Sequence, residues 1–319
     1  MTESYDKSAA VVVLPSVSGG RLRDDKLRGW LSRSAIEAMT GPTEWLTSVL
    51  HVLGYPCPEQ GRAALRMWGQ TGDRPTVWIA AADPVYLELR LDHLCLHALC
   101  RAAVPTSDLR ALIDHLQRTV APDSDFSFAR VASYGYLRAE QAIATASLPA
   151  YAIDQRVPSE FMPSGEEAAR YRALLSEVEM ALHEHDVNQR RQKAGQQPVN
   201  SMWLWGGGCA PEQQAMPHPP LFADDPLLRG YWYSMSGAVD RWPGSIGDCL
   251  SASAAGFVAV APEFEDHDGA MESWLRELRE ALHSGRLNRL TLLFREGICA
   301  DVERSHALRF WRRDSALLD

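Results

Sequence analysis

Several patterns that would assign a function are missing from this sequence of 319 residues. No apolar run reaches the ~18 residues that a membrane helix needs. The longest apolar run near the N-terminus, Ala9–Val13, is too short for the core of a signal peptide. Six cysteines are present but none form a CxxC pair, which excludes a zinc ribbon and a thioredoxin-type motif. We therefore expect a cytoplasmic protein without a membrane partner, whose cysteines are reduced thiols.

Positive charge is also in short supply. Asp and Glu number 41 and Lys and Arg number 32, which gives a formal net charge of −9. A dedicated nucleic-acid binder needs a net basic face that neutralises phosphates, so we expect no nucleic-acid partner. A small anionic ligand in a local basic pocket is compatible with this charge. GxSxG, HExxH, GxGxxG and Walker motifs are absent as well, so the sequence assigns no catalytic residue and no nucleotide loop.

The composition that is present is typical of a globular protein, with 46% hydrophobic and 23% charged residues. Short apolar runs alternate with helical patterns, which predicts an α/β fold: a mostly parallel sheet flanked by helices, with β-hairpin additions. We expect a single α/β domain over 1–319, and the pattern allows a small α+β subdomain over about 75–160. Three apolar runs that end in turn residues are predicted to be neighbouring core strands: Ala9–Leu14, Pro198–Trp205 and Gly256–Ala261.

One segment near the middle of the chain has two alternatives. Pro75–Ala82 is predicted to be a strand that Asp83-Pro84 ends, and Val85–Cys100 could follow as a helix or as two strands turning at Leu91-Asp92. Polar residues that alternate with apolar ones favour the hairpin; they are Tyr86, Glu88 and Arg90.

The most distinctive segment is Glu177–Gly208, in which a helix, a basic turn, a strand and three glycines follow one another. Glycines after a strand allow positive φ and leave backbone amides open for an anion. Arginine offers a forked donor for carboxylate or phosphate. The alternative is structural: the arginine caps carbonyls or pairs with a carboxylate, and no cavity adjoins the glycines. We predict a small-anion pocket built from Asn188, Arg191, Asn200, Gly206, Gly207 and Gly208.

This segment resembles the RpfE-type regulatory proteins of bacteria. A similar Asn-x-x-Arg-x-x-x-Gly run occurs in archaeal cofactor-independent phosphoglycerate mutases, which belong to the alkaline phosphatase superfamily. The resemblance implies a phosphoglycerate-mutase-like scaffold, and in the mutases that scaffold carries two metal ions and a serine nucleophile. The residues that carry the resemblance are Asn188, Arg191, Gly195, Asn200, Trp203, Trp205 and Gly206–Gly208, with Ala82–Val85 and Val13–Pro15 elsewhere.

One departure from the mutases bears on catalysis. Their first strand ends in Asp-Gly, which holds a metal ion, whereas the first predicted strand here ends in Leu14-Pro15-Ser16. Glu263 and His267 have the spacing of a mutase metal pair but lack the glycine before the histidine, so they are weak metal candidates. The scaffold is therefore expected to be degenerate, without phosphoglycerate mutase activity and without a stoichiometric divalent metal.

Three functions follow from these observations. The first is a cytoplasmic regulatory or small-anion-sensing protein without catalysis and without a cofactor. The second is a metal-dependent phosphoglycerate mutase or phosphatase, which would need a divalent metal. The third is a protein-interaction module that binds a protein partner through exposed aromatic side chains.

Overall fold

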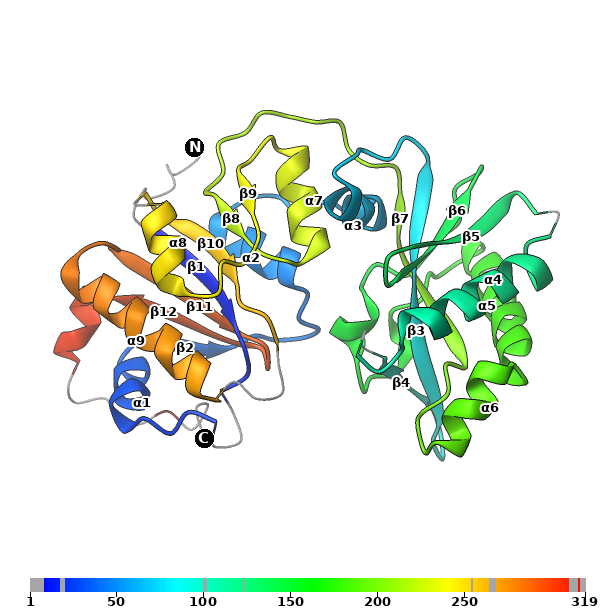
Figure 1. Cartoon of the computed structure of the whole chain (residues 1–319), viewed down its shortest axis with the longest axis horizontal. Helices are drawn as coiled ribbons and strands as arrows, with labels where there is room; N and C mark the ends of the chain where they lie inside the picture. Colours follow the sequence, from blue (N-terminus) through cyan, green and yellow to red (C-terminus); the bar gives the residue numbers. More distant parts are fainter. Residues whose placement is uncertain are drawn as a thin grey trace. The chain divides into compact units, whose positions relative to one another are not determined.

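The computed structural model describes residues 9–17, 21–99, 102–122, 124–253, 255–263, 268–309 and 315 (Figure 1). The chain divides into two compact units. Unit 1 comprises Met1–Cys57 and Gln213–Asp319, and unit 2 comprises Pro58–Glu212. The expected α/β class is confirmed, with mixed sheets flanked by helices. None of the helices in the described ranges combines the length and apolarity needed to cross a membrane.

Among its described residues, unit 1 holds a seven-stranded sheet in the order β2-β12-β11-β1-β10-β8-β9. Neighbours from β11 to β9 run parallel, whereas β12 and β2 are antiparallel additions at one edge. The strands are β1 (Ala9–Leu14), β2 (Ala35–Ala38), β8 (Leu221–Phe222), β9 (Val239–Asp240), β10 (Phe257–Val260), β11 (Arg289–Phe294) and β12 (Ile298–Glu303).

Helices cover the unit 1 sheet because its parallel strands are apolar on both faces. In β1, Ala10, Val12 and Leu14 enter a core shared with α1, α8 and α9, while the alternating Val11 and Val13 are buried on the other face. Helix α2 packs against β1 and α7. The bounds are α1 (Asp25–Ser32), α2 (Trp45–Leu53), α7 (Pro226–Ser234), α8 (Ile246–Ala252) and α9 (Asp268–Ser284), with a short 3-10 helix η3 (Arg304–Leu308).

Unit 2 is built on an antiparallel sheet in the order β4-β3-β6-β5, and β7 pairs with the remaining edge of β3. Helices α4 and α5 share an apolar core with this sheet, and α3 packs on β3 and β7. The elements are α3 (Arg62–Thr71), β3 (Trp78–Leu89), β4 (Leu94–Ala98), α4 (Thr106–Thr119), β5 (Phe126–Val131), β6 (Tyr134–Ala139), η1 (Ala150–Ile153), η2 (Pro158–Glu160), α5 (Glu167–His183), α6 (Asp186–Lys193) and β7 (Ser201–Gly208).

The extent of unit 2 differs from the subdomain expected over about 75–160. The compact unit begins earlier because α3 packs on the sheet, and it ends later because α5 and β7 do so too. The alternation around position 90 predicted a hairpin, and β3 and β4 form one. Strand β3 nevertheless continues through Asp83-Pro84. Proline is tolerated there because β3 changes partner from β6 to β4 at this point, so the missing N–H breaks no ladder bond on that edge.

The prediction that three apolar runs are neighbouring strands is confirmed for two of them and wrong for the third. Strands β1 and β10 are parallel neighbours, with Val11 opposite Val258. The third run forms β7, which lies in the unit 2 sheet antiparallel to β3. Met202 and Leu204 face the core of α4 and α5, and the alternating tryptophans of β7 are buried as well. Burial on both faces marks a central strand but does not identify its partner.

Candidate functional site

The predicted pocket residues at the start of β7 bind the protein's own backbone. Asn188 is buried; its Nδ2 donates to the carbonyls of Leu182 and Val199, both at 2.8 Å, and its Oδ1 accepts from the Val199 amide at 2.8 Å. Asn200 makes a reciprocal pair with Leu87, accepting from its amide at 2.7 Å and donating to its carbonyl at 2.9 Å. These asparagines therefore fasten the segment after α6 to the sheet.

Arg191 is also used by the fold. Its Nε donates to the Gln197 carbonyl at 2.9 Å and its Nη1 donates to the Ala103 carbonyl at 2.8 Å. The Asp108 carboxylate lies 3.9 Å from Nη1. The side chain of Arg191 is only 3% exposed. Arg191 therefore caps backbone carbonyls and lies near an internal carboxylate, as expected if its role is structural.

The three glycines end β7 rather than forming a loop after it. The Gly206 amide donates to the Ala146 carbonyl at 2.8 Å, and the Gly207 amide donates to the Thr145 hydroxyl at 2.9 Å. A Cβ added to Gly208 would lie 2.4 Å from the backbone nitrogen of the residue that caps α3. Glycine is required at this position because α3 begins directly against the strand. The hydrogen bonds of Gly206 and Gly207 also mean that two of the amides predicted to bind an anion already have partners.

The structure does not bring the predicted pocket together. Asn188 and Arg191 contact the chain just before β7, and Asn200 directly precedes the strand, whereas the glycines lie at its other end. An extended chain rises about 3.3 Å per residue, so the six positions between Asn200 and Gly206 span ~20 Å. A small anion cannot contact both groups at once. Ligand binding at either end of β7 stays a prediction.

A different cationic group lies at the edge of the unit 1 sheet where β1, β10 and β11 end. Ligands of α/β proteins bind at this carboxyl edge. Arg295 follows β11 and its amide donates to the Leu14 carbonyl at 3.2 Å. Its Nη2 donates to the Ala261 carbonyl at 3.0 Å, beyond β10, so the guanidinium reaches across the end of β1. Its Nη1 lies 3.5 Å from a carboxylate oxygen of Glu263, and its Cζ lies 5.5 Å from the Trp45 ring centre.

The charged side chains at this edge are a mostly buried guanidinium and an exposed carboxylate. The Arg295 Nε is buried and has no hydrogen-bond partner. Its carboxylate neighbour, Glu263, is 66% exposed and so is strongly hydrated. Within the described residues, the end of β1 is next to this guanidinium, and the two carboxylates nearby are engaged: Glu263 pairs with Arg295, and Glu296 accepts from the Val17 amide at 2.7 Å. His267, the other weak metal candidate, lies outside the described residues.

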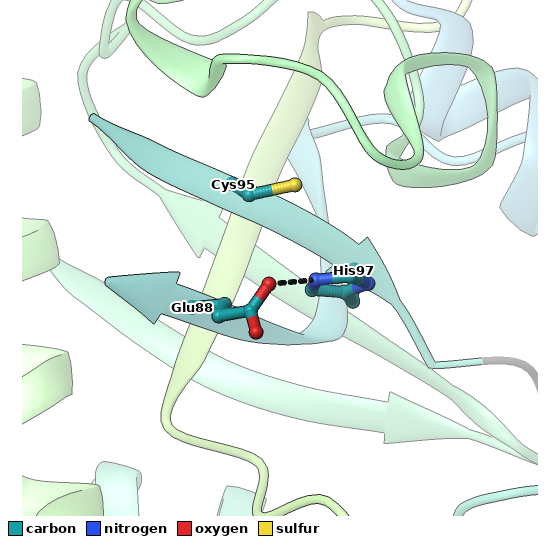
Figure 2. Close-up of side chains that lie close together, drawn as sticks. All are labelled: Glu88, Cys95 and His97. Carbon is teal, nitrogen blue, oxygen red and sulfur yellow. Dashed lines mark hydrogen bonds and ion pairs between the residues drawn. The ribbon is translucent and has the colours of Figure 1, made fainter. Parts of the chain in front are cut away.

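One group of metal-binding side chains converges within the part of the chain that the structure describes, and it lies in unit 2. Figure 2 shows Glu88 on β3 beside Cys95 and His97 on β4. Glu88 is directly opposite Cys95 in the register, and the ligand atoms of the three side chains all lie within 4.8 Å of one another. The His97 Nε2 is 3.0 Å from Glu88 Oε2, and this hydrogen bond is the main cause that lowers the pKa of Glu88.

Sequence reasoning missed this group although the signal was present. A turn centred between Leu91 and Asp92 pairs Glu88 with Cys95, and His97 follows on the same face because side chains of a strand alternate. The predicted hairpin therefore contained the register that brings these three residues together.

Arg66 is another buried charged residue described in unit 2, and it pairs with Asp83 of the Ala82–Val85 motif. Arg66 donates to Asp83 at 2.5 Å, to the Tyr136 hydroxyl at 3.2 Å and to the Gly135 carbonyl at 2.9 Å. The Trp205 indole donates to the other Asp83 oxygen at 2.6 Å. Burial disfavours the charged form of Arg66, but Asp83 and Tyr136 outweigh this effect and raise its pKa. This network joins α3, β3, β6 and β7.

The fold and these sites define an α/β protein with a mostly parallel sheet in one unit and an antiparallel sheet in the other. No family model matches the chain. It is distantly similar to cofactor-independent phosphoglycerate mutases. The 2,3-bisphosphoglycerate-independent phosphoglycerate mutase of Methanosarcina barkeri is 30% identical over 112 residues, which are 34% of this chain and 28% of that protein. A probable mutase of the same name from Geobacter sulfurreducens is 31% identical over 110 residues, 34% of this chain and 27% of that protein.

The matched stretch spans less than a third of the length of these two curated relatives. Among solved structures, the cofactor-independent phosphoglycerate mutase of Thermoplasma acidophilum aligns with 93% of this chain and 89% of its own, at 18% identity and a TM-score of 0.44.

Proposed function

We propose that this protein is a non-catalytic binding protein on a phosphoglycerate-mutase-like scaffold, and that it binds a small anion at the carboxyl edge of the unit 1 sheet. The observation that carries this proposal is the position of Arg295, whose guanidinium reaches across the end of β1 to the Ala261 carbonyl. A regulatory role of the RpfE type is the physiological form of this proposal, in which the bound anion would be the signal.

The electrostatics of this edge support an anion over a metal ion. Two-metal phosphoryl transfer needs carboxylates and histidines that neutralise and hold the cations. The strand end offers Leu14-Pro15 instead, and a guanidinium next to it repels a divalent cation. A guanidinium binds carboxylate or phosphate through a planar fork of donors. The Arg295 Nε is one such donor without a partner.

A metal-dependent phosphoglycerate mutase is the second candidate, and the similarity to the Methanosarcina barkeri mutase favours it. Under this alternative Glu263 would be a metal ligand, and its pairing with Arg295 at 3.5 Å would have to give way to the ion. A protein partner stays a prediction. Tyr231 and Trp232 are buried, so among the described residues Tyr151 is the large aromatic side chain left exposed for such a partner.

An activity assay tests the proposal against this second candidate. The purified full chain is assayed for interconversion of 3- and 2-phosphoglycerate and for phosphatase activity, with Mn²⁺, Co²⁺, Zn²⁺ or Mg²⁺ added. The Methanosarcina barkeri mutase is the positive control. We expect no turnover above the metal-only background. Metal-dependent turnover that Glu263→Ala abolishes, and that Glu303→Ala on β12 leaves intact, would contradict the proposal.

A further inference from the structure

We propose that Glu88, Cys95 and His97 form a zinc site on the β3–β4 hairpin of unit 2. This site goes beyond the proposed function, because the three residues belong to unit 2 and the anion site belongs to unit 1. It also revises, for this hairpin, the expectation that the chain holds no stoichiometric divalent metal.

The backbone register places the three ligands without any rearrangement of the strands. Glu88 and Cys95 are direct cross-strand partners, and His97 is two residues beyond Cys95 on the same face. Figure 2 shows the Glu88 and His97 side chains facing each other across the two strands, with the Cys95 thiol nearby on β4. Their ligand atoms already lie within 4.8 Å of one another, so small rotamer changes bring them to the spacing of a tetrahedral ion.

The surroundings hold the ligands in place. Cys95 is 1% exposed, and the adjacent Leu96 exchanges backbone hydrogen bonds at 3.0 and 2.7 Å with the chain around Arg156. The His97 ring stacks on Tyr86, with ring centres 5.8 Å apart and an interplanar angle of 27°. Cys95 is thus a buried thiol beside an imidazole that stacks on a neighbouring ring, so these two ligands are more restricted in position than side chains of a solvent-exposed cluster. The nearby hairpin end is open to water, with Leu91 fully exposed, so an ion can reach the site from solvent.

The chemistry of the donor set selects zinc. A thiolate, a carboxylate and a neutral imidazole together supply two negative charges to a divalent cation. Thiolate and imidazole favour Zn²⁺ over the oxygen-seeking Mg²⁺ and Ca²⁺. Three protein ligands leave the fourth tetrahedral position to a water molecule. Glu88 Oε2 also accepts from the Arg90 Nε at 3.0 Å. The Arg90 side chain is 47% exposed, whereas that of Arg295 is 18% exposed, so solvent screens the charge of Arg90 and its side chain can move away when an ion binds.

Cobalt substitution of the full-length protein tests the site. The protein is stripped with EDTA, dialysed and titrated with Co²⁺ and then with Zn²⁺ under reducing conditions. We expect a thiolate-to-cobalt charge-transfer band in the near ultraviolet and tetrahedral d–d bands in the visible, both saturating at one equivalent and displaced by Zn²⁺. The absence of a charge-transfer band, or no saturation at one equivalent, would overturn the proposal.

Matched variants assign the band to these residues. Loss of a group that merely supports a ligand costs about 10–100-fold in metal affinity, so Cys95→Ser and His97→Gln are expected to weaken Zn²⁺ binding at least ~100-fold. His93→Gln on the same hairpin and Cys209→Ser in the same unit are controls expected to bind as the wild type does. His93 bonds to Asp92 at 2.6 Å instead, and Cys209 is an exposed thiol. A band that survives Cys95→Ser would contradict the assignment.

A measurement on the wild-type chain keeps the test decisive if a variant misfolds. Because Cys95 is 1% exposed, the rate of iodoacetamide labelling at Cys95 is followed by peptide mass spectrometry in urea just below the unfolding transition, with and without one equivalent of Zn²⁺, and Cys209 serves as the internal control. We expect Zn²⁺ to slow labelling of Cys95 at least tenfold and to leave Cys209 unchanged. Equal rates at Cys95 with and without Zn²⁺ would refute the site. This result is independent of the mutase assay and of Arg295, so failure of one proposal does not decide the other.

Discussion

Two arginines, one in each unit, are held in opposite ways. In unit 2, Arg66 donates to a carboxylate, a hydroxyl and a carbonyl, and the carboxylate of Asp83 accepts a further bond from Trp205. In unit 1, Arg295 donates to a single carbonyl through Nη2, faces an exposed carboxylate at 3.5 Å and has a buried Nε without a partner. The Arg66 guanidinium has a hydrogen-bond partner at Nε, Nη1 and Nη2 and supports the fold. The Arg295 guanidinium keeps one donor, Nε, without a partner, and we propose that it binds an anion.

The residues that match the resemblance motifs are not the residues at the candidate anion site. Asp83, Arg191 and Trp205 match the family patterns, yet each is occupied by contacts within unit 2. Arg295 was not part of any motif, and it lies at the edge where α/β proteins bind ligands.

The largest effect on stability is expected from breaking the ion pair between Arg66 and Asp83. Arg66→Met removes the cation that pairs with the Asp83 carboxylate, which is 17% exposed and keeps the Trp205 indole as a donor, and this is expected to cost ~3–5 kcal/mol of unfolding free energy. Urea unfolding followed by tryptophan fluorescence measures this loss. The double variant Arg66→Met/Asp83→Asn removes both charges and should recover part of the stability. A loss below ~1 kcal/mol for the single variant would show that the network is not structural.

A smaller loss is expected at Arg191. Replacing it with alanine removes two hydrogen bonds from a charged donor, to the Gln197 and Ala103 carbonyls, and at ~1.5 kcal/mol for each bond the total loss is ~3 kcal/mol. The melting temperature should therefore fall clearly in the absence of any ligand. Arg190→Ala, next to it and mostly exposed, is the matched control and should change stability by less than ~0.5 kcal/mol. An unchanged melting temperature for Arg191→Ala, with loss of stabilisation by an added anion, would restore the pocket predicted at this end of β7.

The smallest change in stability is expected at Arg295, whose Nε has no hydrogen-bond partner. Arg295→Met keeps much of the packing against Trp45 and loses one hydrogen bond to the Ala261 carbonyl, so we expect a loss of ~1.5 kcal/mol. Differential scanning fluorimetry gives the shift. A loss as large as that of Arg66→Met would mean that Arg295 supports the fold in the same way, and the contrast between the two units would disappear.

Much of the fold could be predicted from local patterns. The buried β-branched run of β1 and the apolar run of β10 indicated neighbouring core strands, and the alternation in 85–100 favoured a hairpin over a helix, which β3 and β4 form. The partner of β7 could not be predicted, because a strand buried on both faces looks alike in a parallel and an antiparallel sheet.

The candidate sites were less accessible to sequence reasoning, and for two physical reasons. The glycines after Trp205 look like a loop but continue β7, since they make room for the start of α3. Arg295 could not be identified as a candidate ligand-binding residue before the order of the strands was known, because that order places the ends of β1 and β10 beside it. The Glu88–Cys95 pairing, by contrast, followed from the predicted turn.

Calorimetric titration of 3-phosphoglycerate into the wild-type chain, Arg295→Met and Arg289→Met tests the central claim most directly. Arg289 lies at the opposite end of β11 and pairs with Asp301, so it is the matched control. A lost bond to a charged group is ~1.5–3 kcal/mol, so we predict one site per chain that Arg295→Met weakens about 10–100-fold and Arg289→Met leaves unchanged. Equal affinities for the wild type and Arg295→Met, or no binding by the wild type, would contradict the account.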